Sequence, residues 1–269
     1  MGEIKQRLGY SDFDARYGYD QLNEFCRQNL QRPIPEHPFE LLQDGIERVS
    51  LLGSDYCRKL RNMIDLDSVF LKQRAFKVHT LTNILNRELD DRLVAYFHSE
   101  YLPLWCGFEK SAAGNRNGHS FRWHCDEGPS KHLLLSLCLN GTYAHGDTIE
   151  FVERGTTDAF KRAGYVSGDM SEPTLDLVRR ATGYGVDWRP RRLEMAAGDG
   201  ALFEPANVLH RGISPAHGSR YMIEVCLVPS PAPWQEMCAY YAVPSTSADW
   251  PLVDDAWPAQ VLATAEQVA

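Results

Sequence analysis

Short apolar runs separated by turn residues dominate the sequence from about residue 117 onward. Glycine, proline and asparagine divide these runs, and short apolar runs bounded in this way are typical of β-strands. Many short strands at close spacing favour a sandwich or a barrel, and a jelly roll arranges its inward side chains around a central site. The predicted strands cover residues 119–126, 132–139, 147–152, 192–195, 200–204 and 219–228.

The N-terminal third has a different pattern. Apolar residues recur every three to four positions between Phe39 and Ile64, which predicts helices that Gly53 divides, and again between Glu88 and Tyr101. The segment 75–81 alternates in the manner of a strand. Residues 1–38 end in a proline-rich stretch and are interpreted as an arm on the body.

The length predicts a single domain, because barrels and sandwiches of 269 residues frequently form one unit. The fold class expected is mainly β with a helical N-terminal region. The expected parts are a mostly helical support region at 1–115, a jelly-roll core at 116–230 with an insertion at 153–191, and a C-terminal wrap at 231–269.

Two of these parts have open roles. The insertion has helix-like stretches at 156–163 and 171–181, and it is interpreted either as a lid or as a decorative excursion. The C-terminal stretch after Pro229 is rich in aromatic residues and prolines. It wraps either the body or an interface of a homo-oligomer.

Composition excludes several classes of protein. The hydrophobic share of 43% and the charged share of 24% are ordinary for a globular protein. The formal charge of -8, without a Lys/Arg-rich tract, argues against nucleic acid as a partner. Residues 189–192 form the densest basic cluster, interpreted as a solvated loop, with an anionic substrate group as the alternative. No stretch approaches the roughly 20 apolar residues of a membrane span.

The cysteines indicate the redox compartment. Seven cysteines, with no CxxC pair among them, predict neither a disulfide framework nor a zinc knuckle. Reduced thiols, together with an N-terminus that opens no apolar signal region, predict a cytoplasmic protein.

A histidine and a carboxylate two residues apart form the first candidate for chemistry. Successive side chains of a strand point to opposite faces, so His124 and Asp126 share one face and can reach a single ion. The same alternation predicts Ser120 and Arg122 on the metal side. It predicts Phe121, Trp123 and Cys125 on the packing side.

A third ligand must come from another part of the chain. His210 follows the apolar run 201–203 and the turn-like segment 204–207, so it is well placed to supply the third ligand. His132 lies too close to the first pair, and His145 and His217 precede glycines in predicted turns. Two histidines and one carboxylate form the facial triad that holds non-haem Fe(II) and leaves coordination positions open. His124, Asp126 and His210 are therefore the predicted metal ligands and catalytic residues.

Arg220 lies ten residues after His210 in a predicted buried strand, 219–228. A buried arginine requires an anionic partner, and its planar fork suits a carboxylate.

These motifs together resemble the Fe(II)- and 2-oxoglutarate-dependent dioxygenase superfamily. The resemblance rests on Trp-His-x-Asp at 123–126, Gly-Asp-Gly-Ala-Leu-Phe at 198–203, His-Arg-Gly at 210–212 and then Arg220, and it covers roughly residues 115–230. The phytanoyl-CoA hydroxylase-like and prolyl-hydroxylase-like bacterial enzymes are the most similar members. The resemblance implies a double-stranded β-helix, which is a cupin-like jelly roll.

The resemblance also implies a function. It implies Fe(II), 2-oxoglutarate and O2 as cofactor and co-substrates, with Arg220 holding the far carboxylate of 2-oxoglutarate. The expected reaction is hydroxylation of a polar small molecule, with release of succinate and CO2. Related halogenases carry a small residue at the position of Asp126, so its presence favours hydroxylation, desaturation or ring chemistry over halogenation.

One departure from the family pattern concerns Thr148. Prolyl-hydroxylase-like members often carry Gly-Gly-x-Thr-x-Phe, whereas this chain has Gly-Asp-Thr-Ile-Glu-Phe at 146–151. A shift of one residue on a strand moves a side chain to the opposite face, so Thr148 is left out of the site.

Several side chains have two interpretations. Arg122 is predicted to bind 2-oxoglutarate or an anionic substrate, with an ion pair to Glu224 as the alternative. Arg116, Arg122 and Glu224 indicate a polar or charged small molecule. A further group of residues precedes the predicted metal strand and is interpreted as lining a substrate mouth, with a structural role as the alternative. These residues are Trp105, Phe108, Asn115, Arg116, Asn117 and His119.

A second function from another class uses the same residues. A cupin-like metal-binding protein or a non-oxidative metal enzyme would hold a metal without 2-oxoglutarate. Arg220 would then be part of an ion pair in the core. Formation of succinate from 2-oxoglutarate under air distinguishes the two functions.

Overall fold

A computed structural model describes residues 18–36, 44–114, 119–142, 148–165, 170, 172–242, 251–254 and 256–268. His145 and residues 115–117 of the predicted substrate mouth lie outside these ranges.

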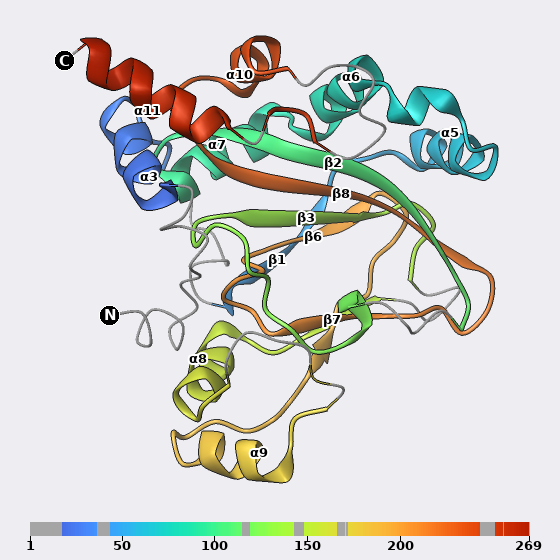
Figure 1. The fold of residues 1–269 in the computed structure, drawn as a ribbon. Coiled ribbons are helices and arrows are strands. Elements are labelled where there is room, and N and C mark those ends of the chain that lie inside the picture. Colours follow the sequence, from blue (N-terminus) through green and yellow to red (C-terminus); the bar gives the residue numbers. More distant parts are fainter. Residues whose placement is uncertain are drawn as a thin grey trace.

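Two antiparallel sheets form the centre of the described chain (Figure 1). The larger sheet has the order β1-β6-β3-β8-β2 and the smaller has the order β5-β4-β7. Long strands β2 and β8 pair along almost their whole length. The strands are β1 (Ile46–Ser50), β2 (Glu100–Ala112), β3 (Leu133–Cys138), β4 (Thr148–Phe151), β5 (Arg191–Arg192), β6 (Asp199–Phe203), β7 (His210–Ile213) and β8 (Ser219–Ser230).

Helices lie on the outer sides of this pair of sheets. Most of them cover the larger sheet on the face away from β7, and α8 and α9 lie beyond the smaller sheet (Figure 1). The helices are α3 (Tyr19–Gln28), α5 (Ser54–Asp65), η1 (Val69–Lys72), α6 (Arg74–Ile84), α7 (Arg87–Phe97), η2 (His119–Phe121), α8 (Arg154–Arg162), α9 (Leu175–Thr182), α10 (Trp234–Tyr240) and α11 (Trp257–Val268). No helix of the described residues is both long enough and apolar enough to cross a membrane.

Strand β3 shows how the sequence divides the two faces of the larger sheet. All of its residues are buried, because one face packs on helices and the other faces the space between the sheets. Leu133, Leu135 and Leu137 belong to the core on the helix side. Leu134 and Ser136 line a cavity on the opposite face. A strand buried on both faces has a continuous apolar sequence, as β3 does.

Most of the predicted strands are confirmed, and so are the helix after Gly53 and the helix that begins near Glu88, as α5 and α7. One N-terminal prediction is wrong and two are wrong in part. The strand predicted at 75–81 is part of helix α6, in which Lys77, Leu81 and Ile84 are buried at helical spacing. Within 39–64, the helix prediction fails at 46–50, because those residues form β1 and pair with β6. The helix predicted from Glu88 to Tyr101 ends at Phe97, and its last residues begin β2.

The strand predicted at 119–126 is also wrong in part. Residues 119–121 form a turn of 3-10 helix, and only Trp123 and His124 make isolated β-bridges. The turn interrupts the expected alternation before Trp123. From Trp123 onward the predicted packing side holds, because Trp123 and Cys125 are both buried in a second apolar cluster.

The insertion supplies that second cluster. Both predicted helices are present, as α8 and α9, and their Phe160 and Leu177 pack with Trp123. The backbone of Met170 pairs with that of Trp123 in both directions. The described part of the insertion therefore lies against the packing side of the segment that carries His124, on the other side from the cavity.

Candidate metal centre

The backbones of two predicted ligands are paired with each other. The amide of His124 donates to the carbonyl of His210 at 3.0 Å, and the amide of His210 donates to the carbonyl of His124 at 3.0 Å. The amide of Asp126 donates to the carbonyl of Pro205 at 2.9 Å, which holds the carboxylate beside the turn before β7. Backbone pairing therefore brings together residues that lie far apart in the sequence.

Each imidazole ring is oriented by its own backbone. Nδ1 of His124 lies 2.6 Å from the carbonyl of Arg122, and Nδ1 of His210 lies 2.8 Å from the carbonyl of Val208. Because a carbonyl only accepts, both Nδ1 atoms carry the hydrogen, and in the neutral rings the lone pair that can bind a metal is on Nε2. Both rings are buried, and their centroids are 4.3 Å apart.

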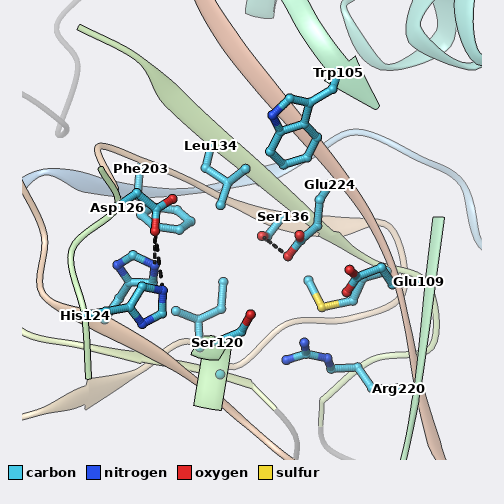
Figure 2. A pocket seen from close by; sticks show the side chains of 14 residues that line it. Trp105, Glu109, Ser120, His124, Asp126, Leu134, Ser136, Phe203, Arg220 and Glu224 are labelled. Atoms are coloured by element: carbon cyan, nitrogen blue, oxygen red, sulfur yellow. Dashed lines mark hydrogen bonds and ion pairs between the residues drawn. The ribbon is translucent and has the colours of Figure 1, made fainter. Parts of the chain in front are cut away.

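Asp126 completes the group. Its Oδ1 lies 3.4 Å from Nε2 of His124 and 3.8 Å from Nε2 of His210 (Figure 2). One ligand atom from each of the three residues lies within 4.8 Å of the others. Burial by itself would raise the pKa of Asp126. In the metal-free protein, the protonated forms of His124, His210 and His132 instead lower this pKa well below its ordinary value, because Nε2 of a protonated His124 donates to the carboxylate and the other two rings act by their charge. The carboxylate is therefore ionised, and a bound cation would take the place of these protons.

The competing histidines do not join this group. His132 is buried near Asp126, but Nδ1 of its ring is in contact with the carbonyl of Pro129. His217 lies exposed in a bend before β8. Among the described residues, the group that can hold a metal consists of His124, Asp126 and His210.

A cavity of about 250 Å³ extends from this group between the two sheets (Figure 2). Arg220 lines the cavity at some distance from the histidines and is only 6% exposed. No described residue forms a hydrogen bond or an ion pair with its guanidinium, which lies 6.0 Å from the ring of Phe121. Glu109 and Glu224 line the same cavity and act on Arg220 electrostatically, but neither forms an ion pair with it, so the donors of the guanidinium are not taken up by a described carboxylate.

Gly212 leaves room for this guanidinium. A Cβ atom at this position would lie 3.4 Å from Nη1 of Arg220 and 3.2 Å from the carbonyl oxygen of Ser120. The distance to the Ser120 carbonyl is tighter than an ordinary van der Waals contact, and the distance to Arg220 is at the lower limit of one. The glycine in His-Arg-Gly therefore has a steric role beside the cavity.

Of the other predicted site residues on this segment, one lines the cavity and one does not. Ser120 lines the cavity, whereas Arg122 is exposed and is not among the lining residues. No ion pair joins Arg122 to Glu224 among the described residues, so that alternative is not present either. The 3-10 turn before Arg122 explains the difference, because it breaks the alternation that would have aimed this side chain inward.

The displacement of Thr148 has the expected consequence. Its hydroxyl donates to the carbonyl of Leu193, and the neighbouring Ile149 lines the cavity instead. A shift of one residue has thus exchanged the threonine for an apolar side chain on the cavity face.

Sequence reasoning missed one acidic residue of the cavity. Glu109 lies on β2 and lines the same space as Arg220 and Glu224. Its strand was not predicted, so the alternation that places Glu109 on the same face as Trp105 was not visible. Pairing of β2 with β8 is the signal that reveals it.

Polar contacts behind the metal group support the strand of His210. Arg211 forms ion pairs with Glu150 at 2.6 Å and with Glu172 of the insertion at 2.6 Å. Its guanidinium carbon lies 4.6 Å from the ring of Trp123. The residue after one metal ligand therefore packs on the residue before the other.

Comparisons with known proteins identify the fold. No protein-family model and no curated protein sequence matches the chain. Among solved structures, EctD from S. alaskensis in its apoform is 12% identical, with a TM-score of 0.53 over 74% of this chain and 82% of that chain. The chain has the fold of EctD. This similarity shows the fold, and the resemblance to the dioxygenase superfamily and to a subfamily of it stays a prediction.

Two further structures show weaker similarity. HygX from Streptomyces hygroscopicus, with nickel and 2-oxoglutarate bound, is 14% identical and has a TM-score of 0.45 over 71% of this chain and 85% of that chain. AviO1 from Streptomyces viridochromogenes is 17% identical and has a TM-score of 0.45 over 72% of this chain and 94% of that chain.

Proposed function

We propose that the protein is a non-haem Fe(II)- and 2-oxoglutarate-dependent dioxygenase that hydroxylates a polar small molecule and releases succinate and CO2. One observation carries the proposal: two histidines and an aspartate converge at a cavity that also contains a buried arginine, and among the described residues no carboxylate lies within 4.0 Å of its guanidinium. The paired sheets around this cavity support a double-stranded β-helix as the finer description of the fold.

The donor atoms fit a ferrous ion. Two imidazole nitrogens and one carboxylate oxygen are the donor set of the facial triad, and residues of this kind leave coordination positions for other ligands. The carbonyls of Arg122 and Val208 fix the tautomers of His124 and His210, so both rings would offer Nε2 to the metal. Asp126 supplies the carboxylate whose loss would be needed for halogenation, so its presence favours hydroxylation.

Arg220 fits the far carboxylate of a 2-oxo diacid. Its guanidinium is buried at the cavity wall, and Gly212 leaves room beside it. A planar guanidinium donates two parallel hydrogen bonds to a carboxylate, which gives both affinity and orientation. The cavity thus offers a metal site and an anion site for the two ends of 2-oxoglutarate.

The residues between these two ends control the environment of the reaction. Bound iron and 2-oxoglutarate would supply the oxidising power for hydroxylation of a C–H bond. Leu134, Ile149 and Phe203 supply the apolar part of the cavity wall. Burial of Arg220 strengthens its hold on a carboxylate, because the effective dielectric constant at a buried site is lower than in water.

Two measurements test the proposal. Anaerobic addition of Fe(II) and then 2-oxoglutarate should produce the weak visible charge-transfer band of a metal-bound 2-oxo acid. Under air, candidate small molecules should then stimulate the formation of succinate. A protein that binds Fe(II) but gives neither the band nor succinate would instead be the cupin-like metal-binding protein or non-oxidative enzyme.

A further inference from the structure

Two glutamates share the cavity with the proposed iron and 2-oxoglutarate sites. Glu109 and Glu224 both line it, and neither belongs to the metal group (Figure 2). The register of β2 and β8 explains why both face inward: Gly107 pairs with Glu224, and Glu109 pairs with Met222. Directly opposite residues of an antiparallel pair share a face, so Trp105 and Arg220 are on this face as well.

The neighbours of Glu224 hold its carboxylate open toward the cavity. On one side, Ser136 donates its hydroxyl to Oε1 at 3.2 Å. On the other side, the paired residue is Gly107, which has no side chain to cover the carboxylate. No other described residue donates a hydrogen bond to Glu224. An oriented carboxylate with one oxygen left for a ligand is a typical recognition group.

The charges of the cavity are unbalanced. Three carboxylates line it, those of Glu109, Asp126 and Glu224, and Arg220 is the guanidinium among the lining residues. A divalent metal would neutralise the Asp126 end. The far carboxylate of 2-oxoglutarate would then take Arg220, and the two glutamates would remain without a cation.

The pKa of Glu224 is consistent with a buried carboxylate that has no cation close to it in the described part of the chain. Burial, and then the nearby Glu109 carboxylate, raise the pKa of Glu224 to about 7, although Arg220 acts in the opposite direction. Burial likewise raises the pKa of Glu109. Two carboxylates that disfavour each other's charge are stabilised together by a cation placed between them.

We propose that Glu109 and Glu224 bind a positively charged nitrogen of the substrate, either an ammonium or a guanidinium group. Trp105 lines the same cavity and offers an aromatic face, which also attracts cations. This assignment rests on the proposed function, because it takes Arg220 as the partner of 2-oxoglutarate. It narrows the substrate class from polar small molecules to amines and guanidines.

A structural role for the two acids predicts a different arrangement. If the glutamates served only to neutralise Arg220, one of them would form an ion pair with it. No nitrogen of Arg220 lies within 4.0 Å of either carboxylate in the described chain. One acid would also suffice for one arginine.

Binding of small probes tests the proposal without turnover. The protein is loaded with Zn(II), which is diamagnetic, and with 2-oxoglutarate, and binding is followed by ligand-observed NMR. Butylguanidinium and butylammonium are the cationic probes, with 1-pentanol as the neutral probe and butyrate as the anionic probe. We expect at least one of the cations to bind about tenfold or more tightly than 1-pentanol, because a carboxylate in a dry site is a strong partner for a cation.

Variants locate the preference. Glu109→Gln/Glu224→Gln keeps the shapes of both side chains and should abolish the preference for cations. Glu24→Gln/Glu236→Gln removes the same charge from exposed helical positions and should leave the preference intact. If the first double variant does not fold, Glu109→Gln and Glu224→Gln alone should each weaken binding of the preferred cation.

The outcomes separate this inference from the proposed function. Equal binding of the cations and 1-pentanol in the unaltered protein, or a preference that survives in Glu109→Gln/Glu224→Gln, would overturn the inference. The charge-transfer band with Fe(II) and 2-oxoglutarate tests the function independently. A band without a cation preference rejects only the inference, whereas a cation preference without a band keeps the cation site and rejects the dioxygenase.

Discussion

Replacement of Arg220 by alanine should weaken the binding of 2-oxoglutarate far more than that of the metal. The side chain is 6% exposed and has no anionic partner within ion-pair distance among the described residues. Loss of one partner of a buried charge pair costs about 2 to 5 kcal/mol. At about 1.4 kcal/mol per tenfold change, the dissociation constant for 2-oxoglutarate should rise roughly 30-fold to several-thousand-fold.

The assay measures the two binding steps separately. Fe(II) is titrated first under anaerobic conditions by calorimetry, and 2-oxoglutarate is then titrated through its visible band. Arg220→Lys should recover only part of the affinity, because an ammonium keeps the charge but loses the planar fork. Arg122→Ala is the matched control, since this arginine is exposed and does not line the cavity.

Two results would refute this reasoning. Equal losses of Fe(II) and 2-oxoglutarate affinity in Arg220→Ala would indicate that the arginine supports the fold. A loss of 2-oxoglutarate affinity in Arg122→Ala as large as that in Arg220→Ala would show that the exposed arginine reaches the co-substrate after all.

Three further changes test the packing and the charges of the site. Gly212→Ala should weaken 2-oxoglutarate binding in the same titration, because the new Cβ would crowd Arg220 and the Ser120 carbonyl, while Gly155→Ala has open space and should have no effect. Trp123→Ala should lower the free energy of unfolding in urea by about 3 to 5 kcal/mol, because the ring is fully buried; a loss below about 1 kcal/mol would contradict its role in the second core. For the metal-free protein, the pKa of Glu224 is raised from 4.5 to about 7, so its contribution to stability is present below pH 4.5 and is lost as the pH rises through about 7. Glu224→Gln should therefore flatten the decline of the melting temperature across this range, and parallel curves for the two proteins would rule out the raised pKa.

The grouping of His124, Asp126 and His210 was predictable because the signals of these residues are local and their order along the chain is specific. The strand that begins at His210 was not among the predicted ones. Arg220 was predictable from its distance to His210 and from the apolar residues around it.

The position of Glu109 beside Glu224 in the cavity was much harder to predict. Glu109 lies in a strand whose first residues resemble the end of a helix, and pairing with β8 decides its conformation. The same competition between local pattern and pairing explains why residues 46–50 form β1 although their apolar spacing predicts a helix. The prediction that Arg122 faces the cavity is wrong for a different reason. One turn of 3-10 helix interrupts the strand alternation on which that prediction depends.

The mutual hydrogen bonds between His124 and His210 have a consequence for how this chain can vary. The spacing of the two ligands is fixed by the register of a backbone bridge, and the chain that connects them does not set it. The insertion that carries α8 and α9 can therefore change in length between its helices without changing this register, provided that the bridge and the packing on Trp123 survive. Those connections are the natural place to graft new loops, because the strands that line the cavity stay in place.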